Sequence, residues 1–118
     1  MLKKIKLELA RTHDHPQGST DCGYEIVAPL DDTGHLDMDG WKQDKIKCTV
    51  RRFWKNEDDQ NGHLVHHLGN HWAIEYENNK LDEEPIFKFD RHVFNEGEYI
   101  SITEHDETEM PFKVVSVA

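Results

Sequence analysis

Histidines give this chain its most evident capacity for chemistry, and several lie in the stretch GHLVHHLGNHWAIEYE at residues 62–77. Two runs of strand-forming residues, His63–Leu68 and His71–Glu77, are separated by Gly69-Asn70, a pair that favours a two-residue II′ turn. The stretch therefore predicts a β-hairpin. We expect its core face to be formed by Val65, Trp72, Ile74 and Tyr76.

The predicted turn also sets which residues face each other. It places His66 opposite Ala73 and Leu64 opposite Glu75, so that His66, His71 and Glu75 share the second face. His66 and His71 are then diagonal neighbours within about 7–8 Å, close enough for two imidazoles to bind one zinc ion. We expect a divalent-metal site there, with Glu75 as an oxygen ligand. The alternative is a solvated face of ordinary polar residues, because no H-E-x-x-H or C-x-x-C motif is present.

A second histidine pair, His13 and His15, flanks Asp14 in a turn-rich loop. In an extended chain an H-x-H pair points both rings to the same side, which suits a pair of ligand-binding side chains. The alternative is that these are the polar residues that any exposed loop contains. Cys22 in the same loop is a poor candidate nucleophile, because the neighbouring Asp21 disfavours its thiolate.

The run RRFWK at residues 51–55 is a cationic and aromatic patch in an acidic chain. If Ile46, Cys48 and Val50 point inward, alternation places Arg52 and Trp54 on the same inward face. Arg52 then either pairs with an internal carboxylate or lines a pocket at a barrel mouth, with Trp54 as the apolar wall. A histidine and a carboxylate in such a pocket would suit a small hydrolase or isomerase.

Short alternating segments predict the elements that position these residues. Strands are expected at 3–10, 23–29, 46–54, 63–68, 71–77, 86–89, 98–104 and 112–117, with a further strand-like run at 92–94 and a short helix capped by Asp37. This pattern is typical of an all-β fold. We expect one β-barrel-like domain over residues 1–118, a small antiparallel barrel or half-closed meander of seven to eight short strands with one short helix. A sheet that stays open leaves edge strands, and a homodimer is one way to cover them.

The charge composition limits the classes of molecule that this chain can bind. The 118 residues carry 24 acidic and 14 basic side chains, a net charge of -10, which disfavours nucleic acid and anionic membranes as partners. The two cysteines form no C-x-x-C pair, and the first ten residues are too short and charged for a signal peptide. No apolar run reaches transmembrane length. We therefore expect a cytoplasmic protein with reduced thiols.

The runs EIVAPLDDTGHLD, RRFW, GHLVHH, GEYISITEHD and FKVVSV resemble a family of small uncharacterised bacterial proteins across nearly the whole chain. The resemblance implies a bacterial, cytoplasmic, single-domain protein and carries over no activity, cofactor or functional residue. The residues themselves favour a non-catalytic binding or interaction module with a protein or small molecule as ligand. The two alternatives are a zinc-binding protein that uses the histidine-rich hairpin, and a small hydrolase or isomerase with its site at the barrel mouth.

Overall fold

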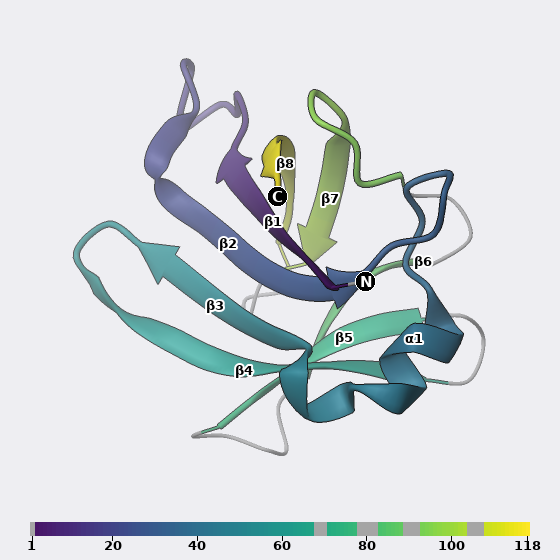
Figure 1. Ribbon diagram of the computed structural model, residues 1–118. Coiled ribbons are helices and arrows are strands. Elements are labelled where there is room, and N and C mark those ends of the chain that lie inside the picture. Colours follow the sequence, from purple (N-terminus) through teal and green to yellow (C-terminus); the bar gives the residue numbers. More distant parts are fainter. Residues whose placement is uncertain (1, 68–70, 78–82, 89–92, 104–107) are drawn as a thin grey trace.

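The computed structural model describes residues 2–67, 71–77, 83–88, 93–103 and 108–118, with the backbone alone at 67, 71 and 83–88 (Figure 1). Eight strands follow one another: β1 Leu2–Leu9, β2 Ser19–Pro29, β3 Thr49–Trp54, β4 Glu57–His67, β5 His71–Tyr76, β6 Glu83–Lys88, β7 Tyr99–Thr103 and β8 Glu109–Val117. A short helix, α1 (Met38–Gln43), and a 3-10 turn, Lys45–Lys47, lie between β2 and β3.

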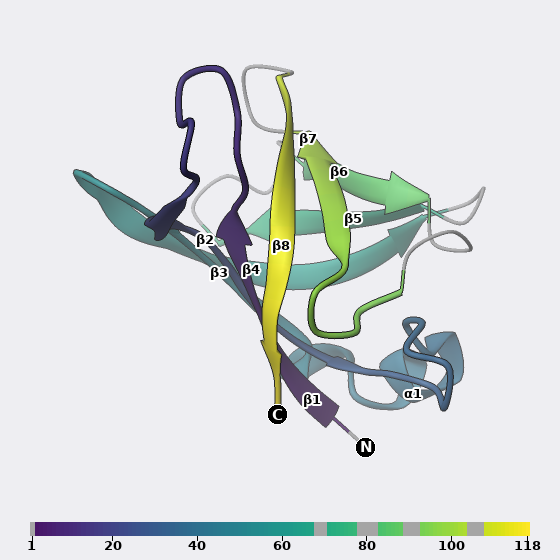
Figure 2. The same cartoon turned by 90° about the horizontal axis from the view of Figure 1, so that it is seen from above.

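The strands form one antiparallel sheet in the order β6-β5-β4-β3-β2-β1-β8-β7. β8 returns to β1, where Lys4 and Ala118 exchange two backbone hydrogen bonds of 2.9 and 3.0 Å. The sheet curls until its outer strands β6 and β7 lie near each other (Figures 1 and 2). The predicted all-β fold, a half-closed antiparallel meander with one short helix, is confirmed.

Alternation along the strands places one set of side chains inside the curl. In β1, for example, Ile5, Leu7 and Leu9 are buried while Lys6 and Glu8 face outward. The interior is filled by large side chains from every part of the sheet whose side chains are described, among them Tyr24, Ile26, Val50, Leu64, Trp72, Ile74, Ile100, Ile102, Phe112 and Val114. The concave side of the sheet is therefore a packed core.

Helix α1 lies at one end of the curled sheet, and the loop between β1 and β2 extends beyond the other end (Figure 2). Asp37 caps the helix as predicted, because its carboxylate accepts from the backbone N–H groups of Asp39 and Gly40 at 3.1 and 3.3 Å. The indole of Trp41 donates a buried 2.8 Å hydrogen bond to the carbonyl oxygen of Leu64, which fixes the helix against β4.

Two expectations about the strand that contains Arg52 have different outcomes. The inward positions of Cys48, Val50 and Arg52 are confirmed, since all three side chains are buried. The inward position of Ile46 is wrong, because this residue belongs to the 3-10 turn that precedes β3 and its side chain is 84% exposed. A residue in such a turn no longer follows the two-residue period of a strand.

The predicted hairpin forms, but its register is wrong by one residue. The structure pairs His67 with His71, His66 with Trp72, and His63 with Glu75. A shift of one residue moves every side chain of a strand to the opposite face. The predicted core face of β5 is confirmed for Trp72, Ile74 and Tyr76, but in β4 the fully buried residue is Leu64 and Val65 is only partly buried. Compared with the predicted register, the observed one buries Leu64 instead of the smaller Val65, which removes more apolar surface from water.

Candidate functional site

The corrected register separates the residues that the sequence grouped as metal ligands. His66 shares the inner face with Trp72, and its ring lies 4.7 Å from that indole and 6.0 Å from the indole of Trp41. Glu75 pairs with His63 on the outer face, and the side chain of His71 lies outside the described residues. Within the described parts of the chain, no three His, Cys, Asp or Glu side chains gather as metal ligands would. Zinc binding here stays a prediction, now without its geometric basis.

The second histidine pair sits in a tight reversal of the chain rather than in an extended segment. Thr12 and His15 exchange backbone hydrogen bonds of 3.0 and 3.2 Å. His13 is fully exposed at the tip, 3.6 Å from the Asp14 carboxylate, whereas the His15 ring folds back to within 3.5 Å of the Thr12 hydroxyl. The extended chain on which the same-side orientation of the two rings depended is therefore not seen, and their ligand-binding role remains a prediction.

Arg52 pairs with a carboxylate of the same chain, Glu57, which was one of the two alternatives considered for this residue. Its side chain is 6% exposed, and Nη1 lies 3.3 Å from Oε1 of Glu57. The guanidinium also stacks 4.3 Å from the ring centre of Trp54, which packs in turn against Phe112. The expected position of Trp54 beside Arg52 is thus confirmed, with the indole as the surface on which the guanidinium rests. These contacts make Arg52 part of the core at this end of the sheet.

The neighbouring Arg51 points outward, as alternation predicted, and is neutralised by carboxylates. It donates to Glu25 at 2.7 and 3.0 Å and to Asp59 at 2.7 Å. The hydrogen bonds to Glu25, followed by those to Asp59, raise the pKa of the Arg51 guanidinium above its ordinary value. Arg51 lines a shallow groove of about 410 Å³, but its charge is already satisfied there.

Two further groups that can titrate have structural roles. The Asp31 carboxylate accepts from the Thr33 hydroxyl at 2.7 Å and from the backbone N–H groups of Thr33 and His35 at 2.9 and 3.0 Å. The hydroxyl bond, more than the backbone bonds, lowers the pKa of Asp31. Both cysteines are free and buried, and burial raises the pKa of the Cys48 thiol to about 11. Cys48 is therefore a protonated core residue rather than a nucleophile.

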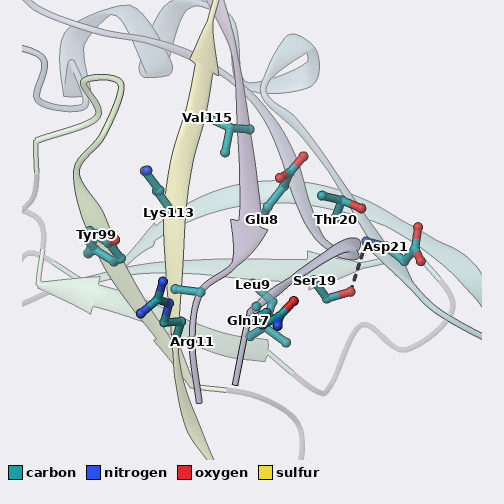
Figure 3. Close-up of a pocket in the computed structure, with 12 residues that line it drawn as sticks. Glu8, Leu9, Arg11, Gln17, Ser19, Thr20, Asp21, Tyr99, Lys113 and Val115 are labelled. Atoms are coloured by element: carbon teal, nitrogen blue, oxygen red, sulfur yellow. Dashed lines mark hydrogen bonds between the residues drawn. The ribbon is translucent and has the colours of Figure 1, made fainter. Parts of the chain in front are cut away.

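A groove of about 690 Å³ on the outer face of the sheet brings together residues that sequence reasoning missed (Figure 3). It is lined by Glu8, Leu9, Ala10, Arg11, Gln17, Gly18, Ser19, Thr20, Asp21, Tyr99, Lys113 and Val115. Strand pairing builds its floor, because Glu8 of β1 pairs with Lys113 of β8, and Lys113 pairs with Tyr99 of β7. We call this feature the outer groove.

The loop between β1 and β2 forms one wall of the outer groove. Ala10 donates a 3.0 Å backbone hydrogen bond to Pro111 of β8, and Gly18 donates one of 2.9 Å to His15. The first bond continues the β1–β8 pairing past the end of β1, which holds Arg11 beside the sheet. A side chain at position 18 would collide with the carbonyl oxygen of Leu9, and the positive φ of 73° also favours glycine.

The charges of the outer groove are segregated (Figure 3). Arg11, Lys113 and the ring of Tyr99 lie on one side, and Glu8 and Asp21 lie on the other. Among the described residues, Arg11, Lys113 and Asp21 form no ion pair, whereas Glu8 lies 3.7 Å from the Lys6 ammonium. The Tyr99 side chain is 62% exposed. The groove thus offers two cations, one anion and an aromatic face to a ligand.

The remaining polar side chains of the outer groove are suited to hydrogen bonding. The Ser19 hydroxyl accepts from the backbone N–H of Asp21 at 3.1 Å, which orders the backbone at the start of β2. Gln17 and Thr20 add an amide and a hydroxyl to the lining. This set can bind a polar molecule through hydrogen bonds and charge.

No helix among the described residues has the length and apolar character needed to cross a membrane. Comparison with known proteins gives no relative: no family model, no curated protein and no solved structure matches this chain. The resemblance to small bacterial proteins therefore stays a prediction, and the function has to be argued from the geometry of the site.

Proposed function

We propose that this protein is a non-catalytic binding protein and that the outer groove holds its ligand, a small polar molecule with at least one anionic group. The single observation that carries the proposal is the pair of cations, Arg11 and Lys113, which face the groove without ion-pair partners in the described chain. In a chain of net charge -10, acidic partners for surface cations are plentiful. Two cations left open beside one concavity support a role in holding an external anion.

Size and surroundings support the same proposal. The volume of about 690 Å³ lies within the roughly 300–1,000 Å³ typical of small-molecule sites. The inner face of the sheet is packed with side chains, so the outer face is where a ligand finds space. The two arginines of β3 do have carboxylate partners. Arg52 pairs with Glu57, and Arg51 pairs with Glu25 and Asp59. This contrast is what distinguishes the outer groove from the groove of about 410 Å³ beside Arg51.

The net negative charge favours a small ligand over nucleic acid, since phosphate backbones need net cationic contacts. Two free, buried cysteines fit a reducing compartment such as the bacterial cytoplasm.

A thermal-unfolding screen tests the proposal. A ligand at ten times its Kd stabilises the native state by about 1.4 kcal/mol, which raises the Tm of a chain of this size by roughly 6 °C. We expect carboxylates or zwitterions in a panel of small carboxylates, amines and zwitterions to raise the Tm by this order. The panel is repeated on a double variant, Arg11→Gln with Lys113→Gln, in which the rise should disappear.

A matched control keeps the loss of two positive charges but moves it away from the groove. Lys47 and Lys55 are exposed and do not line the outer groove, so Lys47→Gln with Lys55→Gln should keep the ligand response. A response that survives in the groove variant, or a panel in which no compound raises the Tm, would contradict the proposal.

A further inference from the structure

We infer that the ligand of the outer groove is a short peptide of about three residues with both termini free. This inference rests on the proposed function and adds the chemical class of the ligand. Three observations lead to it: the opposite charges that are open on the two sides of the groove, the number of strands between them, and the exposed ring of Tyr99.

The open charges set the ends of the ligand. Two carboxylates lie on the anionic side of the groove. Glu8 is partly neutralised by the Lys6 ammonium at 3.7 Å, whereas Asp21 forms no ion pair with any described residue. On the cationic side Arg11 and Lys113 are both open. An ammonium group at Asp21 and a carboxylate at the two cations would match both sides. A dicarboxylate would be repelled at Asp21, and a diamine would be repelled at the cations.

Strand spacing sets the length. Asp21 belongs to β2 and Lys113 to β8, and β1 lies between these two strands. Two steps of about 4.8 Å separate the strands, and Asp21 lies two residues along β2 from Gly23, the residue level with Lys113, so the two backbones are roughly 12 Å apart. An extended peptide advances about 3.3–3.6 Å per residue, so roughly three residues cover this span. A single amino acid is too short to reach both charges.

Tyr99 sets the preference at the carboxyl end. It pairs with Lys113 and lies one strand farther from Asp21. Its ring is 62% exposed, and in Figure 3 it lies on the same side of the groove as Arg11 and Lys113. A peptide whose carboxylate reaches these cations places its last side chain near the ring. An aromatic C-terminal residue should therefore bind more tightly than glycine.

Isothermal calorimetry with the peptide glycyl-glycyl-phenylalanine tests the inference. We expect N-acetylation and C-amidation each to raise the Kd about tenfold, the effect of losing one charge-assisted hydrogen bond. Replacing the phenylalanine by glycine should also weaken binding. Free phenylalanine should bind more weakly than the tripeptide because it cannot span the two sides.

Two variants assign each terminus to its partner. In Asp21→Asn the free and N-acetylated peptides should bind equally, and in Lys113→Gln the sensitivity to C-amidation should fall, because each variant removes the group that reads that terminus. Asp58→Asn and Lys47→Gln are the matched controls, since Asp58 and Lys47 are exposed and lie outside the groove. Both controls should bind like the unaltered protein.

The outcomes separate this inference from the proposed function. If the tripeptide does not bind, or binds equally well with both ends blocked, while a simpler carboxylate raises the Tm through Arg11 and Lys113, the peptide inference is overturned and the binding function stands. If neither the tripeptide nor any compound of the panel binds, both are overturned.

Discussion

Replacing Arg52 by alanine should cost about 3 kcal/mol of unfolding free energy, most of it from packing rather than from the ion pair. Alanine removes two buried methylene groups, worth about 0.8 kcal/mol each, and the stack on Trp54 at 4.3 Å, worth about 1 kcal/mol. The contact with Glu57 adds at most about 1 kcal/mol, because the Glu57 side chain is 54% exposed to solvent that screens the pair.

Two further variants divide this total. Arg52→Met keeps an unbranched, apolar stem at this position and removes the charge, so it should cost only about 1 kcal/mol. Glu57→Gln leaves the stack and the stem in place and should cost less than about 1 kcal/mol. We therefore expect alanine at position 52 to be the most damaging change of the three.

Urea unfolding followed by tryptophan fluorescence measures these differences, because the chain contains three tryptophans and single domains of this size usually unfold in one step. If Glu57→Gln costs as much as Arg52→Ala, the ion pair dominates and the packing account is wrong. If Arg52→Ala is nearly neutral, Arg52 is not part of the core, and the barrel-mouth pocket of the hydrolase or isomerase alternative regains its basis.

Three further predictions concern the backbone and two titrating groups. Gly23→Ala should cost about 3 kcal/mol in the same urea assay, because its Cβ would collide with the carbonyl oxygen of Leu7; a cost below about 1 kcal/mol would refute this close approach. Burial raises the pKa of the Cys48 thiol to about 11 in the folded state, so the thiol of the unfolded chain ionises at lower pH. Between about pH 9 and 11 the free energy of unfolding should therefore fall by up to roughly 1.4 kcal/mol per pH unit more in the unaltered protein than in Cys48→Ala. Identical slopes in the two proteins would be inconsistent with a buried thiol. Thr33→Val should raise the lowered pKa of the Asp31 carboxyl, measured by NMR titration, because it removes the hydrogen bond from the Thr33 hydroxyl. Asp31 stabilises the folded state above its ordinary pKa and loses this effect as the pH falls through its lowered pKa, so the variant should have less of this stabilisation. An unchanged pKa would rule out the hydroxyl hydrogen bond as the main cause of the shift.

Local alternation was enough to predict the fold. The inward sides of β1 and β3 follow from Ile5, Leu7 and Val50, because a half-buried strand needs apolar residues at every second position. Turn chemistry was not enough to predict the register of the hairpin. Gly69-Asn70 favours a two-residue turn, but the pairing is set by what the strands bury, and burying Leu64 opposite Ile74 shifts it by one residue.

The outer groove was beyond reach from the sequence for a different reason. Glu8, Asp21, Tyr99 and Lys113 look like ordinary outward residues when each strand is considered alone. They meet only because β8 returns to pair with β1, a contact between the two ends of the chain that no local spacing encodes. One signal was present, the long polar loop after β1, since loops held against a sheet often carry binding residues.

Ligand binding in the outer groove can be located by an NMR titration of the ¹⁵N-labelled protein with glycyl-glycyl-phenylalanine and, separately, with acetate as the simplest carboxylate. If the ligand binds in the outer groove, the backbone amides of the groove residues should shift first and saturate together, while those around Arg51 and Glu25 stay in place. The groove amides to follow are those of Glu8, Arg11, Ser19, Tyr99 and Lys113. Shifts that centre on the groove beside Arg51, or that spread evenly over the surface, would contradict the assignment of the outer groove as the binding site.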